Sequence, residues 1–203
     1  FLKPGGEPEV ETIAFETPEI FTVLHSLVKK TAAAAGISLP TELAGDSMEF
    51  GTENAEVFLK FLEGFDALNY IQQSDGMVAL EFNAEPPMDT LLQSVELDPD
   101  FEGPYQVLVG LNRACMAYNI GGFELCDRVL KKLTELVPDD FAAYFALGEL
   151  YQKVGDMNRA VDYFEAAAQK NPEDPAILNR LGNAQMANNM PVNAERNFRK
   201  AVE

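Results

Sequence analysis

The sequence predicts a mainly α-helical protein in which helical hairpins stack in register behind a short N-terminal α/β segment. The main observation is a repeat in the C-terminal half, where residues of the same type recur with numbers that differ by 34. The matched positions are Leu147-Gly148 with Leu181-Gly182, Ala160 with Ala194, Phe164 with Phe198, and Ala167 with Ala201. A fixed period of this size indicates an array of stacked supersecondary units.

The apolar pattern inside one period predicts two helices joined by a short turn. The break lies at Gly155-Asp156, since glycine commonly ends a helix. Pro172 closes the second helix, because proline cannot continue the hydrogen-bond ladder. The residues that share a helical face are Tyr144, Leu147, Gly148 and Tyr151 before the break, and Ala160, Phe164 and Ala167 after it.

These residues resemble the tetratricopeptide repeat (TPR), a 34-residue helix–turn–helix unit with a Leu-Gly pair, an alanine, a phenylalanine and a proline. The resemblance implies a TPR-type superhelix with three units over residues 104–203. The first unit is divergent, although it keeps Ala114, Gly121, Leu130 and Pro138. It departs from the later units at Gly110, Arg113 and Cys126.

Residues 52–103 are predicted to form an irregular TPR-like helical pair with an insertion. We expect helices over Asn54–Ile71 and Met88–Leu97, from their apolar faces. The connection over residues 72–87, which includes Gly76 and Pro86-Pro87, is much longer than a TPR turn.

Residues 1–51 do not follow the repeat and are predicted to belong to a truncated α/β domain. Alternation over Glu9–Phe15 predicts a short strand, and Thr17-Pro18-Glu19 is a typical helix start before a helix that ends at Gly36. The order of elements over residues 9–106 resembles the junction between a TolB-like amino-terminal domain and TPR units in bacterial multidomain proteins. That resemblance implies a bacterial source and supplies no catalytic residue.

The chain is strongly acidic, with a formal net charge of −18. Residues 1–103 hold 20 acidic and 4 basic side chains, against 13 and 11 in residues 104–203. This charge disfavours nucleic acid and anionic lipid surfaces and favours basic or neutral partners, chiefly through the first half of the chain. No apolar run is long enough to insert into a membrane. Because the chain starts at Phe1 without methionine, we expect a trimmed piece of a longer protein; a cytoplasmic location is favoured and export stays open.

No motif for catalysis, nucleotide, cofactor or metal is found. His25, the single histidine, is expected to be a packing or surface residue, and the run Asp98–Glu102 is expected to be an interhelix turn. The acids Glu42, Asp46, Glu49 and Glu53 fit a solvated loop. An enzyme would require His25 or these acids to converge in a pocket. Cys115 and Cys126 do not make a zinc site and are expected to be buried free thiols, with a disulfide as the alternative.

The TPR resemblance implies a concave groove lined by the first helix of each unit, and hence a non-catalytic scaffold that binds a protein or peptide. Exposed asparagine amides can hold a peptide backbone, and apolar side chains can bury its anchors. The alternative is a regulatory or sensor appendage of a larger bacterial enzyme. Homo-oligomers through the apolar ends of the array are a further expectation. The expected groove residues are Leu108, Leu111, Tyr118, Asn119, Phe145, Glu149, Gln152, Lys153, Asn179, Asn183 and Met186, with Cys115, Ala142, Ala176 and Ala187 at equivalent positions.

Overall fold

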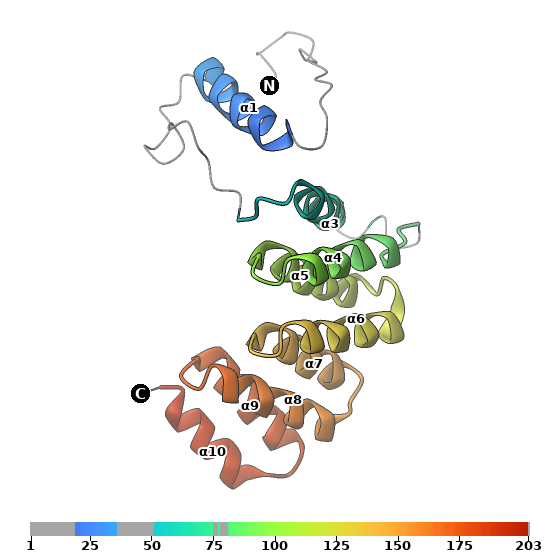
Figure 1. Ribbon diagram of the computed structural model, residues 1–203. Helices are drawn as coiled ribbons and strands as arrows, with labels where there is room; N and C mark the ends of the chain where they lie inside the picture. Colours follow the sequence, from blue (N-terminus) through green and yellow to red (C-terminus); the bar gives the residue numbers. More distant parts are fainter. Residues whose placement is uncertain (1–18, 36–50, 75–76, 78–80, 203) are drawn as a thin grey trace. The chain divides into compact units, whose positions relative to one another are not determined.

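The computed structural model describes residues 19–35, 51–74, 77 and 81–202, and within these ranges the chain is helical without a strand (Figure 1). The fold is therefore mainly α, as predicted. The strand expected over Glu9–Phe15 lies outside the described residues, as do Glu42, Asp46, Glu49 and the side chain of His25. None of the helices in these ranges has the length and apolar character that a bilayer crossing needs.

The chain divides into two compact units, Phe1–Glu56 and Val57–Glu203. The first unit contains α1 (Ile20–Ala35), which follows the predicted start signal at residues 17–19. Helix α3 (Ala55–Gln73) begins at the boundary, and its residues from Val57 onward belong to the second unit.

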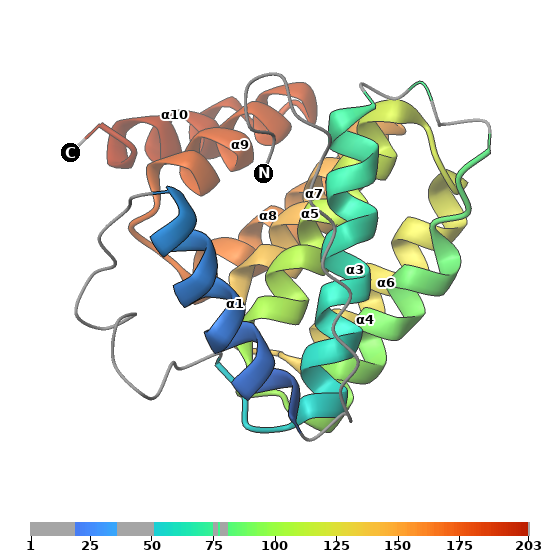
Figure 2. The ribbon, with the colours of Figure 1, turned by 90° about the horizontal axis from the view of Figure 1, so that it is seen from above.

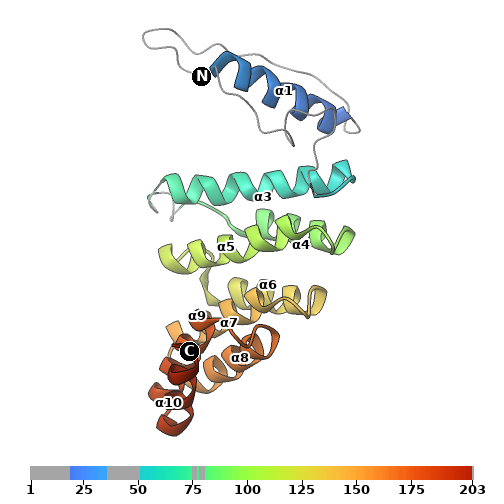
Figure 3. The same cartoon turned by 90° about the vertical axis from the view of Figure 1, so that its left-hand side faces the viewer.

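The second unit continues as a series of helices, which Figure 3 shows stacked layer after layer. They are α4 (Glu85–Leu97), α5 (Glu102–Tyr118), α6 (Gly122–Leu136), α7 (Phe141–Lys153), α8 (Met157–Lys170), α9 (Pro175–Ala187) and α10 (Pro191–Lys200). Helix α7 packs on α8, and α9 packs on both α8 and α10 (Figure 2). The helical hairpins predicted after Phe141 are therefore confirmed.

Aspartate side chains cap three helices at their N-termini. Asp140 and Asp174, which are 34 residues apart, accept from the backbone N–H of Ala142 and Ala176, each at 2.8 Å. Asp156 caps α8 by accepting from Arg159 N–H at 3.1 Å. Such caps satisfy donors that have no partner inside the helix. Gly155 precedes the last cap with φ +83°, a backbone region that glycine adopts without strain.

Helix α4 begins three residues earlier than the sequence analysis predicted. Pro86 and Pro87 lie inside its first turn and do not belong to the connection, so that prediction was wrong. The first turn tolerates proline because its N–H groups have no acceptor within the helix. Helix α3 packs on α4, where the Ser94 hydroxyl donates to the Val57 carbonyl at 3.0 Å. The turn predicted at residues 98–102 does connect α4 to α5.

A polar cluster ties α6, α7 and α8 together around the buried Tyr151. Its hydroxyl donates to Asp127 Oδ1 at 2.6 Å and accepts from Arg159 at 3.2 Å. The Arg159 guanidinium lies 4.3 Å from the centre of the Tyr151 ring, and Tyr163 stacks on that ring at 5.3 Å. This cluster fixes α7, which carries the centre of the candidate site.

Candidate peptide-binding face

One acidic side chain joins the first helices of three successive hairpins. Glu149 on α7 accepts from Arg113 on α5 at 2.8 Å, and its other oxygen lies 3.6 Å from Arg180 on α9. The Glu149 side chain is 21% exposed, whereas Arg113 and Arg180 are 45% and 51% exposed. We call this row and the exposed side chains around it the inner face. Its members are Arg113 on α5 and Asn119 at the end of that helix, Glu149 and Lys153 on α7, and Asn179, Arg180, Asn183 and Met186 on α9.

The ion pairs of the inner face contribute little to folding. Pairs between side chains this exposed are worth roughly 0–1 kcal/mol, because water and salt screen them. The row therefore adds little to the stability of the array. The guanidinium groups of Arg113 and Arg180 are partly exposed, so their remaining N–H donors can bind another carboxylate.

Phe145 lies beneath this row and is buried, at 8% exposed. Its ring meets Phe164 edge-on at 5.4 Å between centroids, and the Arg113 guanidinium lies 5.3 Å from its centre. Phe145 thus positions Arg113 by a cation–π contact and is itself covered. The interpretation of Phe145 as an open apolar anchor is corrected on this point.

Leu108 and Leu111 are also misplaced by the sequence interpretation, since both are fully buried, as is Cys115. Helix α5 packs against α4, α6 and α7, so little of its surface is left for solvent. Tyr118 and Gln152 are half-buried. Among the other expected groove residues, those that reach solvent are Asn119, Lys153, Asn179, Asn183, Met186, Ala176 and Ala187, and Ala142 is half-buried.

Asn119 and Lys153 lie at one end of the inner face. Asn119 ends α5 in the left-handed region, with φ 62°, so it closes the helix. The Lys153 ammonium donates to the Met116 carbonyl in the last turn of the same helix. The exposed asparagines at positions 179 and 183 lie with Met186 on α9.

Arg113 and Arg180 are absent from the groove residues predicted from the sequence. Arg113 stood out only as a departure from the repeat. A usable signal was the spacing from Glu149, since 113 to 149 and 149 to 180 are 36 and 31 residues, both near the 34-residue period. Opposite charges one repeat apart on first helices are expected to meet side by side.

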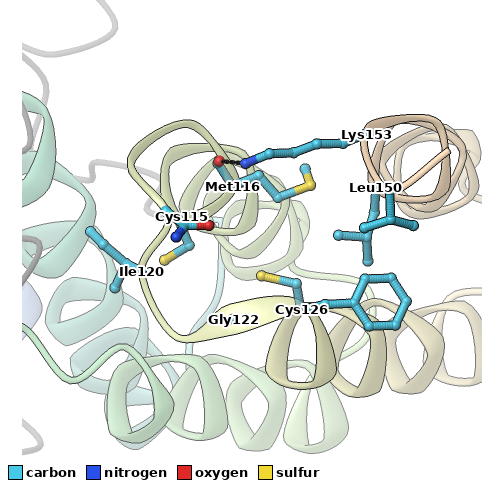
Figure 4. A pocket seen from close by; sticks show the side chains of 10 residues that line it. Cys115, Met116, Ile120, Gly122, Cys126, Leu150 and Lys153 are labelled. Atoms are coloured by element: carbon cyan, nitrogen blue, oxygen red, sulfur yellow. Dashed lines mark hydrogen bonds between the residues drawn. The ribbon is translucent and has the colours of Figure 1, made fainter.

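Cys115 and Cys126 line a cavity between α5, α6 and the end of α7 (Figure 4). Both are buried free thiols, as predicted. Burial raises the pKa of Cys115 to about 12, with a further contribution from Cys126. Burial also raises the pKa of Cys126 to about 11, although the Lys153 charge acts in the opposite direction. Thiols that stay protonated at neutral pH are poor nucleophiles, so the pair is not suited to covalent catalysis.

Residues 141–184 match the family described as Tetratricopeptide repeat. Among solved structures, the chain is similar to "MamA 41-end from Desulfovibrio magneticus RS-1", with 13% identity and a TM-score of 0.55. It is similar to "MamA RS-1 ArsTM double mutant" with 15% identity and a TM-score of 0.56; each alignment covers 93% of this chain and 94% of the other. "Crystal structure of MamA protein" has 16% identity and a TM-score of 0.51, over 92% of this chain and 90% of that one. At these identities the likeness concerns the fold. The chain therefore contains a tetratricopeptide repeat and shares a helical-hairpin superhelix fold with these proteins.

Proposed function

We propose that this chain is a non-catalytic interaction scaffold that binds an extended protein segment across α5, α7 and α9. The observation that carries the proposal is the row formed by Arg113, Glu149 and Arg180, one residue from each of three successive hairpins. A ligand that follows this row contacts all three hairpins at once. The repeat found at residues 141–184 supports the same function, because stacked repeats form extended binding surfaces.

Helix α9 supplies the groups suited to a peptide backbone. Asn179 and Asn183 are exposed and one helical turn apart, so both amides lie on the same side of α9. Each amide donates and accepts hydrogen bonds, which is what a peptide group requires. Met186, at 52% exposed, lies one turn further on and offers a flexible apolar contact.

The charge of the inner face favours an acidic segment. Arg113, Lys153 and Arg180 are the basic side chains of α5, α7 and α9, against Glu149 in the row and Glu102 in the first turn of α5, in a chain whose net charge is −18. A carboxylate of the ligand can take a guanidinium fork from either arginine. The first half of the chain, with 20 acidic and 4 basic side chains over residues 1–103, repels such a ligand and disfavours its binding there.

The test starts from a displayed random-peptide library selected on the wild-type protein, and measures binding of the recovered peptides by fluorescence anisotropy. We expect recovered sequences to be enriched in Asp and Glu, and binding to be lost on Arg180→Ala and on Asn183→Ala. Arg199→Ala is the matched control, since Arg199 is 69% exposed on α10 and pairs with Glu195 of the same helix. Equal binding by all three variants would overturn the proposal.

A further inference from the structure

Cys115 and Cys126 line a cavity that has no part in the proposed function. It is small, about 70 Å³, and partly open to solvent, and its lining includes the apolar side chains of Ile120 and Leu150. A cavity of about 150 Å³ holds benzene, so this smaller one has room for an ion and not for an organic ligand of ordinary size. Figure 4 shows the thiol groups projecting from α5 and α6 into the same space.

The residues that line this cavity supply three sulfur atoms, beside the side-chain amide of Asn119 and the ammonium of Lys153. These sulfur atoms are the thiols of Cys115 and Cys126 and the thioether of Met116. No carboxylate or imidazole is among the groups that line the cavity. Thiolate and thioether ligands select soft metal ions, whereas magnesium and calcium require oxygen. Structural zinc sites need four ligands, and within the described residues no group of three or more His, Cys, Asp and Glu is placed to hold a metal.

Lys153 sets the charge that the site can hold. Its ammonium lies near enough to lower the pKa of Cys126, and it donates to the Met116 carbonyl beside the cavity (Figure 4). Two thiolates with a monovalent cation carry one net negative charge, which the Lys153 ammonium balances. With a divalent cation the same group would leave an unbalanced positive charge next to a buried site, which is unfavourable.

We propose that this cavity binds one soft monovalent cation of the Cu(I) class between the sulfurs of Cys115 and Cys126. Two S–H bonds are replaced by two sulfur–metal bonds, the two protons pass to solvent, and no atom changes its oxidation state. The alternative fate of the pair is a disulfide, which needs an oxidant and a reactive thiolate. Burial keeps the empty pair protonated and so slows that reaction.

The experiment titrates the reduced wild-type protein with Cu(I) under anaerobic conditions, in competition with a coloured Cu(I) chelator. We expect one Cu(I) per chain, and copper-edge X-ray absorption that shows sulfur neighbours alone. Cys115→Ala and Cys126→Ala should each lose this uptake, and Lys153→Gln should weaken it. Far-ultraviolet circular dichroism reports whether each variant is folded.

Met77→Leu is the control for copper held by exposed methionine, because Met77 is 88% exposed. This variant should take up copper as the wild type does. Uptake that persists in a folded cysteine variant would overturn the proposal, as would nitrogen or oxygen neighbours in the wild-type absorption spectrum. Absence of uptake by the reduced wild type, with a disulfide formed in air, would assign the pair to redox chemistry instead.

Discussion

Gly148 faces the ring of Phe164 so closely that a β-carbon at position 148 would lie 2.6 Å from two ring atoms. Gly182 and Phe198 repeat the relationship one period later, at 2.5 Å. In the divergent unit the equivalent positions are Ala114 and Leu130. Where the first helix has Ala114 in place of glycine, the second helix has the smaller Leu130 in place of phenylalanine. The total side-chain volume at the two positions is therefore limited by their contact.

Gly148→Ala is predicted to destabilise the protein by about 1–3 kcal/mol, because the methyl group overpacks a fully buried ring. In the Phe164→Leu background the same change should cost less, since that pair reproduces Ala114 with Leu130. Urea unfolding of the two single variants and the double variant measures the coupling. Strictly additive losses would argue against direct contact.

Tyr151→Phe is predicted to cost about 1–2 kcal/mol, because it removes the hydroxyl that joins Asp127 to Arg159 and leaves polar groups with fewer partners. Tyr163→Phe serves as the matched control on the same stacked pair, and a smaller loss is expected because that ring is half-buried. The measurement is the midpoint of thermal unfolding. Equal losses in the two variants would contradict the role assigned to the Tyr151 hydroxyl.

Asp156 is predicted to make stability fall in acid. Hydrogen bonds from the backbone and side chain of Arg159 hold the pKa of this carboxyl below its usual 3.8. The carboxylate therefore contributes stability above that value, and the contribution is lost as pH falls through the lowered pKa. Asp156→Asn keeps a capping side chain without the charge. The wild type should exceed this variant in urea midpoint at pH 7, and the gap should shrink below about pH 4; a constant gap would count against this explanation.

The two cysteines are predicted to react slowly with iodoacetamide in the folded protein. Their pKa values of about 12 and about 11 mean that the rate should still be rising with pH above 9, where urea-unfolded chains begin to level off. Mass spectrometry of the alkylated protein follows both sites. Rapid modification of the folded chain at neutral pH would show that the thiols are neither buried nor protonated as described.

The repeat made the second half of the fold predictable, because each 34-residue period carries the residues that pack its own hairpin, as Gly148 and Phe164 do. Exposure was not predictable from repeat position. Leu108 and Leu111 occupy nominal groove positions and yet are buried, since the array folds α4 and α7 against α5. The ion pairs of Glu149 join helices of three hairpins, so the pattern within one hairpin does not reveal them, and the only sequence signal is their spacing near 34 residues. The TolB-like junction and the role as an enzyme appendage stay predictions.

The most direct test of the central claim is hydrogen–deuterium exchange of the wild-type protein with and without a selected acidic peptide. The account predicts that the peptide slows exchange in α5, α7 and α9, which carry Arg113, Glu149 and Arg180, and leaves α6, α8 and α10 nearly unchanged. Protection confined to the second helices, or none at a peptide concentration that saturates binding, would contradict it.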